Sequence, residues 1–184
     1  MKKWFSLLAV LALLAASACT VESISTVSLD GSTSMEQVIG ALIEGYDITD
    51  ARINYSGTGS GAGIEAVLSG ICDIGLSSRT LKDKETEKGA QAHLIALDGI
   101  AVIVNTQNPL NDLTAQQLCD IFTARVTNWV QLGGGDAPIA VYGREAGSGT
   151  REAFESALGI VDHCVYTNEY GSNGDMTGNV STNP

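Results

Sequence analysis

The chain has 184 residues, of which 44% are apolar and 17% are charged, and its formal net charge at pH 7 is −11. This composition is that of a globular protein and excludes an intrinsically disordered one. The negative charge argues against nucleic acid as a partner, and it means that any bound anion must be held by local dipoles and a few aimed donors, because the overall field repels it.

The first 18 residues have the layout of a secretory signal peptide. Lys2 and Lys3 precede an apolar run over residues 4–16, and small residues follow. The run is too short to span a bilayer, and no later segment approaches the roughly 20 apolar residues that a spanning helix needs. We therefore predict an exported chain without a transmembrane helix, and removal of residues 1–18 changes its formal charge from −11 to −13.

Two cleavage sites compete at the end of this segment. Residues 16–18 suit an ordinary signal peptidase, whereas residues 14–19 resemble a bacterial lipobox, in which Cys19 is lipidated and becomes the new N-terminus. A cysteine placed by chance directly after the small-residue run is improbable, so we favour the lipobox. Residues 19–25 are then a lipidated, polar tether that anchors an extracytoplasmic protein to the cell membrane.

Strand-like and helix-like segments alternate along the mature chain. Strands are predicted at 26–30, 52–55, 74–77, 93–104 and 138–143, and helices at 35–46, 62–69, 82–88, 114–122 and 150–158. Thr114 and Gln117 have the spacing of a capping box at the start of one helix. This alternation predicts an α/β layered fold with a largely parallel sheet.

A polar stretch with a proline, residues 105–111, is the predicted crossing between two lobes. Lobe 1 is then residues 26–105 and lobe 2 is residues 106–184. From Thr167 onward the chain is rich in Asn, Gly, Ser and Thr, and we predict no closing element there.

Cysteines and histidines give no sign of a metal or redox site. The spacing of Cys72, Cys119 and Cys164 fits neither a zinc site nor a CxxC pair, so we interpret them as small apolar core residues, with a Cys119–Cys164 disulfide as the alternative. His93 and His163 stand apart from any ligand cluster and are interpreted as structural. We therefore predict neither a metal nor a cofactor.

Three segments share one pattern: a strand, then a turn of Gly, Ser and Thr, then the first turn of a helix. They are residues 31–34, 57–63 and 147–150. The N-terminus of a helix leaves backbone N–H groups unpaired and carries partial positive charge, which suits an anion. For any single turn, a capped helix without a ligand is the simpler interpretation.

The middle turn also matches a dinucleotide-binding pattern, G-x-G-x-x-A, through Gly57, Gly59 and Ala62. The helix that follows is too short before Gly70 for the crossover helix of that fold, which argues against a nucleotide.

The three turns together, with Arg144 just before the third, favour a small tetrahedral oxyanion as ligand. Arginine offers a planar, permanently charged fork that can bond two oxygens at once. A surface salt bridge with the neighbouring Glu145 is the alternative for this side chain.

Five motifs occur in a fixed order along the chain. They are GSTSM at 31–35, YSGTGSG at 55–61, DIGLSSR at 73–79, TNW at 127–129 with two glycines at 133–134, and REAGSGTR at 144–151. On these motifs the chain resembles the phosphate-binding proteins of phosphate ABC transporters, in the shorter form found as lipoproteins in Gram-positive bacteria. The resemblance runs from Ser28 to the end.

The resemblance implies an α/β, two-lobe fold of the periplasmic-binding-protein type II, with inorganic phosphate bound in the cleft and a membrane ABC permease as partner. Relatives of this type continue well past the position that matches Pro184, so the second lobe is expected to be incomplete. No enzymatic activity is implied.

Site residues carry over one by one from the motifs. From the first lobe, phosphate would be contacted by Ser32, Thr33, Ser34 and Ser60, and from the second lobe by Arg144, Ser148, Gly149 and Thr150. Some relatives carry an aspartate that accepts the proton of bound phosphate, whereas this chain has Ser78, whose hydroxyl can also accept a hydrogen bond.

Three other functions compete with this one. A receptor for sulfate or molybdate would use the same kind of site. A secreted phosphatase with a serine nucleophile is disfavoured, because no histidine or acidic pair lies near the candidate serines in sequence. A sensory or adhesive surface protein could reuse the fold.

Overall fold

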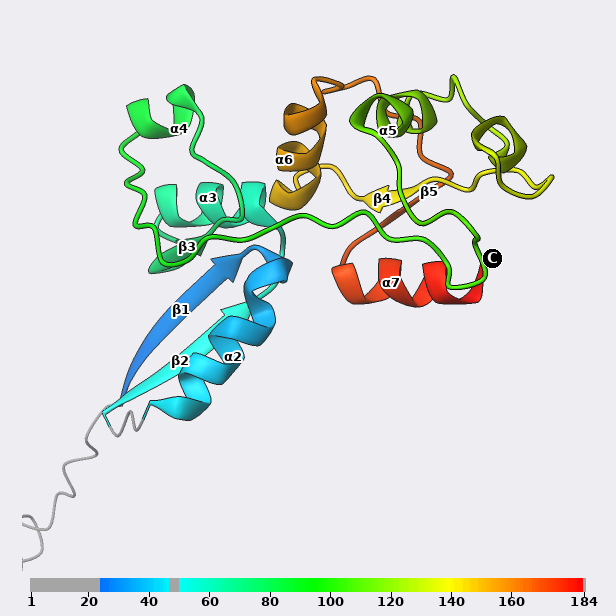
Figure 1. Cartoon of the computed structure of the whole chain (residues 1–184). Coiled ribbons are helices and arrows are strands. Elements are labelled where there is room, and N and C mark those ends of the chain that lie inside the picture. Colours follow the sequence, from blue (N-terminus) through cyan, green and yellow to red (C-terminus); the bar gives the residue numbers. More distant parts are fainter. Residues whose placement is uncertain (1–23, 47–49, 184) are drawn as a thin grey trace, which may run out of the picture.

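Two small parallel sheets, one in each half of the chain, organise the structure (Figure 1). The structure is a computed structural model that describes residues 24–46 and 50–183. The first sheet has the order β2-β1-β3 and the second pairs β4 with β5. The strands are β1 (Ser25–Gly31), β2 (Ala51–Ser56), β3 (Ile74–Leu76), β4 (Tyr142–Arg144) and β5 (Asn168–Tyr170).

Helices surround both sheets. They are η1 (Thr33–Met35), α2 (Glu36–Gly45), α3 (Ser60–Leu68), α4 (Asp83–Glu87), α5 (Ala115–Phe122), η2 (Trp129–Leu132), α6 (Gly149–Leu158) and α7 (Asn173–Thr182). Helix α2 lies along β1 and β2, while α7 lies below β4 and β5 (Figure 1). No helix in the described part of the chain has the length and apolar character needed to cross a membrane.

The first sheet and α2 share one apolar core. Leu29 of β1, Ile39 of α2 and Leu76 of β3 are each less than a tenth exposed and pack together. Leu29 is paired in register with Tyr55 of β2 and Ile74 of β3. Since alternate residues of a strand face the same side of a sheet, this register directs the apolar face toward α2.

Helix α3 packs unusually close to β1. A Cβ atom at Gly63 would lie 2.4 Å from both the carbonyl oxygen of Asp30 and the Cα atom of Gly31. Only a residue without a side chain permits this approach, which brings the N-terminus of α3 beside the end of β1.

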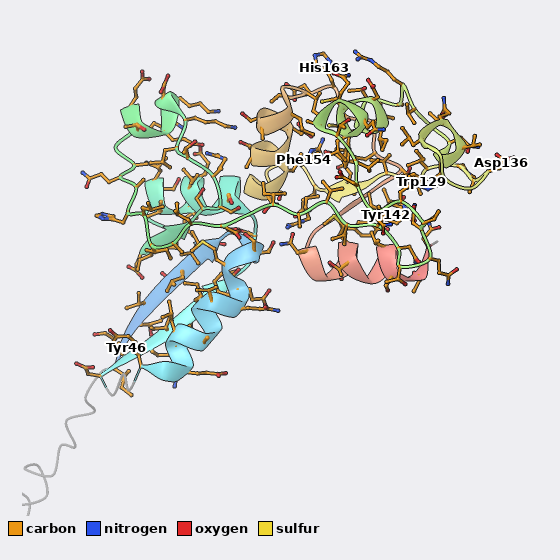
Figure 2. The ribbon with its side chains drawn as sticks, viewed as in Figure 1. Tyr46, Trp129, Asp136, Tyr142, Phe154 and His163 are labelled. Carbon is orange, nitrogen blue, oxygen red and sulfur yellow. The ribbon has the colours of Figure 1, made fainter. Side chains whose placement is uncertain are left out.

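Aromatic side chains hold the second half together. Phe122 of α5 packs against Phe154 of α6, with ring centroids 4.7 Å apart, and against Tyr166 at 6.0 Å. Figure 2 places Phe154, Tyr142 and Trp129 in this half, far from Tyr46 at the end of α2. The two halves therefore have separate cores.

Local sequence patterns predicted most elements correctly. The three strands of the first sheet, the helices α2 to α6 and the capping box at α5 are confirmed. In that box the Thr114 N–H donates to Gln117 Oε1 at 2.8 Å and the Gln117 N–H donates to Thr114 Oγ1 at 3.2 Å. The predicted lobe boundary at residue 105 lies between the two sheets and stays a prediction.

The prediction of a strand at 93–104 is wrong. This segment is extended but forms no ladder, and its apolar side chains are exposed, with Leu94 at 82% and Leu97 at 90%. A strand needs a neighbour for its N–H and C=O groups, and the described residues supply none for this segment.

Two further predictions need correction. The strand predicted at 138–143 is shorter, since β4 begins only at Tyr142 and Pro138 forms an isolated bridge with Asn128. The polar tail does form elements, β5 and α7. Helix α7 starts where the Ser172 hydroxyl accepts a hydrogen bond from the Asp175 N–H at 3.0 Å, a cap that the polar composition concealed.

Cys72, Cys119 and Cys164 are free thiols, so the alternative Cys119–Cys164 disulfide is not formed. Cys72 is buried as predicted, whereas Cys119 and Cys164 are only half-buried. Both His93 and His163 are exposed. The signal peptide, Cys19 and most of the tether lie outside the described residues.

Candidate anion-binding site

The three predicted strand-turn-helix segments converge at one point, where the two halves of the molecule meet. They connect β1 to η1, β2 to α3, and β4 to α6. The Gly59 N–H donates to the Gly31 carbonyl at 2.8 Å, and the Gly61 N–H donates to the Gly147 carbonyl at 3.1 Å. Main-chain hydrogen bonds therefore link the middle turn to both of the others.

Ser60 and Ser78 meet Gly149 in the centre of this junction. Ser60 is fully buried, and its Oγ lies 3.1 Å from Ser78 Oγ and accepts from the Ser78 N–H at 3.1 Å. A Cβ atom at Gly149 would lie 2.3 Å from Ser60 Oγ and 2.7 Å from Ser78 Oγ. The first turn of α6 thus touches these two serines of the first half of the chain only because Gly149 has no side chain.

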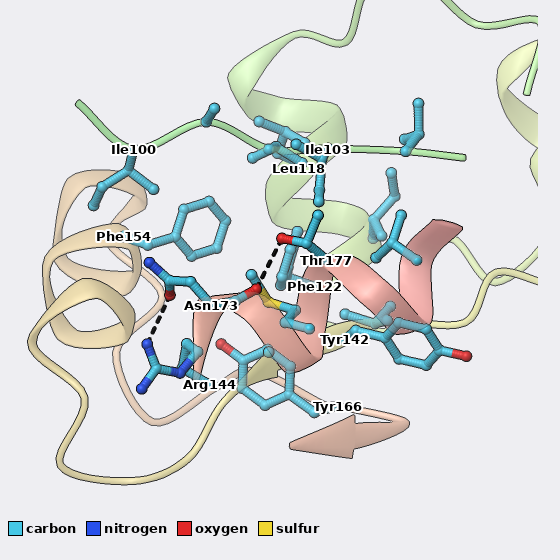
Figure 3. A pocket seen from close by; sticks show the side chains of 18 of the residues that line it. Ile100, Ile103, Leu118, Phe122, Tyr142, Arg144, Phe154, Tyr166, Asn173 and Thr177 are labelled. Carbon is cyan, nitrogen blue, oxygen red and sulfur yellow. Dashed lines mark hydrogen bonds between the residues drawn. The ribbon is translucent and has the colours of Figure 1, made fainter. Parts of the chain in front are cut away.

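Arg144, at the end of β4, is 3% exposed and donates every hydrogen bond to a neutral acceptor. Its Nε donates to the Tyr170 carbonyl at 3.0 Å and its Nη1 to Asn173 Oδ1 at 2.7 Å, as Figure 3 shows for Asn173. Its Nη2 donates to the Gly171 carbonyl at 2.6 Å and to Thr33 Oγ1 at 2.8 Å. The last bond joins the second half of the chain to the first.

No carboxylate compensates the charge of Arg144 among the described ion pairs, so the predicted alternative, a salt bridge with Glu145, is not formed. Burial lowers the pKa of the Arg144 guanidinium, while the charges of Glu145 and Asp175 act in the opposite direction. A guanidinium nevertheless stays protonated at neutral pH. A buried cation with neutral partners is costly, and a bound anion would offset that cost.

Helix α6 directs its N-terminus toward Ser60 and Ser78. Ser148 caps this helix, since its Oγ accepts from the Arg151 N–H at 3.4 Å, and its hydroxyl hydrogen remains able to donate. Gly149 and Thr150 follow as the first helical residues, whose N–H groups have no partner within a helix. These groups carry the partial positive charge of the helix end.

Ser32 and Ser34 form the other side of the junction. Ser32 is 2% exposed, its N–H donates to the Leu76 carbonyl at 2.9 Å, and its Oγ lies 2.8 Å from Ser34 Oγ. The Ser32 N–H is therefore not available to a ligand, whereas the two hydroxyls are.

Residues 15–176 match the family model of the PBP superfamily domain. The chain belongs to the PBP superfamily. It is 40% identical over 108 residues to a protein named phosphate-binding protein PstS 2 from Streptococcus agalactiae serotype V, which covers 58% of this chain and 37% of that protein.

Solved structures of the superfamily agree with this fold. One from Clostridium perfringens, described as a phosphate ABC transporter substrate-binding protein with bound phosphate, has a TM-score of 0.81 and 41% identity, covering 85% of this chain and 66% of that one. An ABC-type phosphate transport receptor from Vibrio cholerae has a TM-score of 0.62 and 37% identity, covering 84% of this chain and 66% of its own. The present chain thus spans about a third to two thirds of the length of these relatives.

Within this candidate site, sequence reasoning missed Asn173, which accepts a hydrogen bond from Arg144 Nη1. The available signal was the pair Ser172 and Asp175, whose spacing predicts a helix start and would have placed Asn173 in its first turn. All nine predicted phosphate contacts lie at or beside the junction, but their contact with a ligand stays a prediction.

A cavity of about 420 Å³ lies beside the junction, under residues 98–105. Figure 3 shows Ile100, Ile103, Leu118 and Phe122 on its walls, with Arg144 and Asn173 at one end. Three of the predicted phosphate contacts, Ser34, Arg144 and Thr150, also line this cavity. Its apolar walls do not suit a hydrated anion, so we place the candidate site at the polar end, where the cavity meets the junction. No cluster of three or more metal-ligating side chains occurs among the described residues.

Proposed function

We propose that this protein is an extracytoplasmic solute-binding protein that captures inorganic phosphate for import by an ABC transporter. One observation carries the proposal: Arg144 is buried at the meeting point of two helix N-termini and several hydroxyls, and every acceptor that it contacts is neutral. The site lacks one negative charge, and a phosphate would supply it.

The likeness to the clostridial protein with bound phosphate supports phosphate over other oxyanions. In this proposal Thr33, Ser60 and Ser78 bind the ligand from the first lobe, and Arg144 and Thr150 bind it from the second. Closure of the two lobes then encloses the ligand, a motion that periplasmic binding proteins use as a class. The Ser78 hydroxyl, or another group of the site, would accept a hydrogen bond from the protonated oxygen of phosphate, which fully ionised sulfate lacks.

We also propose that the mature protein begins at a lipidated Cys19, and that the closed form is recognised by a membrane permease. Several acyl chains such as palmitate would hold it stably, whereas a single chain binds only marginally. The intact mass of membrane-extracted protein should show an N-terminal Cys19 with added lipid. Cleavage elsewhere, or an unmodified Cys19, would contradict this.

The test of the function is calorimetric titration of the full-length natural protein with phosphate, with sulfate and molybdate as competitors. Arg144→Ala should weaken phosphate binding roughly 30-fold to several thousand-fold, because removal of one partner of a buried, hydrogen-bonded charge pair costs about 2–5 kcal/mol. Arg144→Lys should also weaken it, since an ammonium lacks the planar fork.

Arg125→Ala is the matched control, because Arg125 is 70% exposed and pairs with Asp120 at 3.4 Å away from the junction. It should bind phosphate as the wild type does. If the phosphate affinity of Arg144→Ala is within about twofold of that of the wild type, Arg144 does not bind the ligand and the proposed site is contradicted. Turnover of a chromogenic phosphate ester would instead favour the phosphatase.

A further inference from the structure

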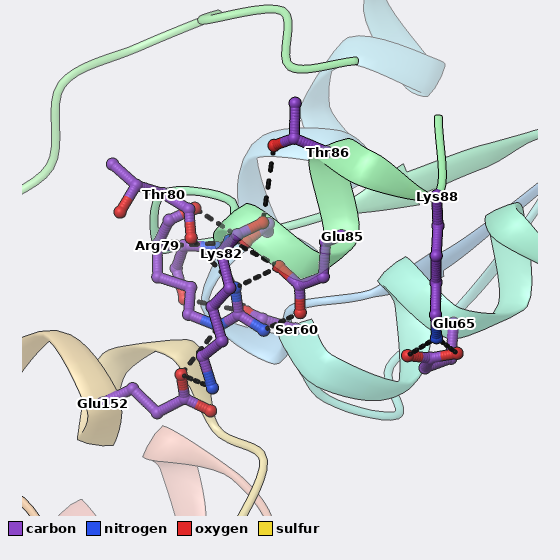
Figure 4. A network of polar contacts seen from close by, with 11 residues as sticks. Ser60, Glu65, Arg79, Thr80, Lys82, Glu85, Thr86, Lys88 and Glu152 are labelled. Atoms are coloured by element: carbon purple, nitrogen blue, oxygen red, sulfur yellow. Dashed lines mark hydrogen bonds and ion pairs between the residues drawn. The ribbon is translucent and has the colours of Figure 1, made fainter. Parts of the chain in front are cut away.

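A second set of charged groups joins the two lobes outside the anion site. Glu152 of α6 lies with its Oε2 2.9 Å from Arg79 Nε and 2.8 Å from Lys82 Nζ (Figure 4). Arg79 and Lys82 belong to the first half of the chain, between β3 and α4, whereas Glu152 belongs to the second half. A single carboxylate is thus shared by two cations across the junction.

The first half of the chain holds Arg79 in a fixed orientation. Its Nη1 and Nη2 donate to the two carboxylate oxygens of Glu85 at 2.9 and 2.8 Å. The Lys82 N–H donates to the same carboxylate at 2.8 Å, and the side chains of Arg79 and Glu85 are 6% and 4% exposed. This bidentate pair leaves the Nε edge of the guanidinium facing α6.

Arg79 Nε has unused hydrogen-bonding capacity. It is buried, and its N–H does not point at the Glu152 oxygen 2.9 Å away, so the contact is an ion pair without hydrogen-bond geometry. The remaining protein around Nε offers it no acceptor in the described structure. Glu152 is therefore the group that compensates this edge, and only while α6 lies against the first lobe.

From this arrangement we propose that Glu152, with Arg79 and Lys82, forms an interlobe latch that stabilises the closed, ligand-bound form. The proposal rests on the function proposed above. Glu152 lies in the first turn of α6 together with Gly149 and Thr150, so the latch also positions the N-terminus of this helix over the ligand. Glu152 is a positioning residue in this scheme and does not touch phosphate.

The direction in which phosphate affinity changes when Glu152 is replaced distinguishes a latch from a simple electrostatic effect. Glu152 is an anion close to an anion site, so without a latch its removal would leave phosphate binding unchanged or make it tighter. With a latch, its removal makes binding weaker, because the closed form loses an interaction that the open form does not make.

The experiment compares phosphate affinity and dissociation rate in the wild type, Glu152→Gln and Glu65→Gln, all in the full-length natural protein. Glu65 is the matched control, since it forms an exposed ion pair with Lys88 at 3.3 Å inside the first lobe. Glu152→Gln should bind about three- to tenfold more weakly and release phosphate faster, and Glu65→Gln should behave as the wild type. The difference in phosphate affinity between the wild type and Glu152→Gln should shrink in 1 M NaCl, because salt screens the partly exposed ion pairs of Glu152.

Lys82→Gln provides a second variant in case Glu152→Gln folds poorly, and thermal melts report on folding. Loss of a cation near an anion site would weaken phosphate binding even without a latch, so the sign of this change is not diagnostic. The diagnostic result is that the double variant loses less phosphate affinity than the sum of the two single losses. If Glu152→Gln binds phosphate as tightly as the wild type or more tightly, the latch is overturned. The latch is also overturned if Glu152→Gln and Glu65→Gln lose the same amount of phosphate affinity.

Small-angle X-ray scattering without phosphate tests the latch independently of the ligand. If the wild type binds no phosphate, the proposed function fails, but the latch still predicts a larger radius of gyration for Glu152→Gln than for Glu65→Gln. Equal radii in that case would overturn the latch as well.

Discussion

Arg79 and Arg144 are both buried cations, and they differ in what compensates their charge. Arg79 has a carboxylate partner with bidentate geometry in Glu85, while Arg144 has only neutral acceptors. The charge of Arg79 is already compensated within the fold, whereas Arg144 lacks a counter-charge at a junction of helix ends, and for this reason we propose Arg144 as the anion ligand. This contrast separates a structural arginine from a ligand-binding one.

At the residue scale, Glu85 should make stability depend on pH in the acid range. The hydrogen bonds from Arg79 lower the pKa of Glu85 from 4.5 to about 2, against the opposing effect of burial. Because the folded state favours the ionised form, the stabilisation is complete above pH 4.5 and is lost as the pH falls from 4.5 to 2. This contribution of Glu85 to the free energy of unfolding amounts to about 3 kcal/mol.

Urea unfolding of the wild type and Glu85→Gln between pH 7 and pH 2 measures this contribution. Glu85→Gln should be less stable at pH 7, since it leaves Arg79 buried without its partner. The difference in free energy of unfolding between the wild type and Glu85→Gln should narrow by about 3 kcal/mol as the pH falls from 4.5 to 2. A gap that stays constant over this range would show that Glu85 is not held as an ion pair.

At the scale of elements, contact between the lobes depends on a helix that begins with glycine. We expect Gly149→Ala to weaken phosphate binding by about fivefold to 150-fold, because its Cβ would overlap Ser60 Oγ and Ser78 Oγ in the closed form, and overpacking costs about 1–3 kcal/mol. The melting temperature without phosphate should change little, since opening of the lobes relieves the overlap.

Gly40→Ala is the control for Gly149→Ala. Gly40 also lies within a helix, α2, and a Cβ atom there would meet nothing within 4 Å. This substitution should leave binding intact and raise stability slightly, because alanine is the better helix former. Unchanged phosphate affinity in Gly149→Ala would show that the ligand-bound lobes lie further apart than in this structure.

At the scale of the whole molecule, residues 93–104 present an apolar surface that has no partner strand within residues 24–46 and 50–183. They cross between the two halves above the cavity of about 420 Å³, and this chain spans 66% of the clostridial protein. We predict that, in a protein of the full length of these relatives, an additional segment pairs with residues 93–104 and completes the second lobe. An unpaired apolar edge otherwise favours aggregation and local opening.

Thermal melts and phosphate titration of residues 20–184, beside the same chain continued with its natural downstream sequence, test this. The longer chain should melt at higher temperature and bind more tightly, since a mobile second lobe lowers apparent affinity in proportion to its competent fraction. A cooperative melt and equal affinity for residues 20–184 alone would contradict it.

The sequence by itself determined the features that depend on neighbours along the chain. The strand-turn-helix segments, the capping box at Thr114 and the glycines at close approaches follow from local patterns, because caps and turns are satisfied within a few residues. The ordered motifs also indicated the superfamily and the set of candidate site residues.

Tertiary structure decided what depends on groups far apart in sequence. Arg144 meets Thr33 111 residues away and gains Asn173 from a tail that looked featureless, and Glu152 meets Arg79 across the lobes. Residues 93–104 have the composition of a strand but lie unpaired, because a strand exists only where a second one satisfies its backbone. Composition alone carries no information about whether that partner is present.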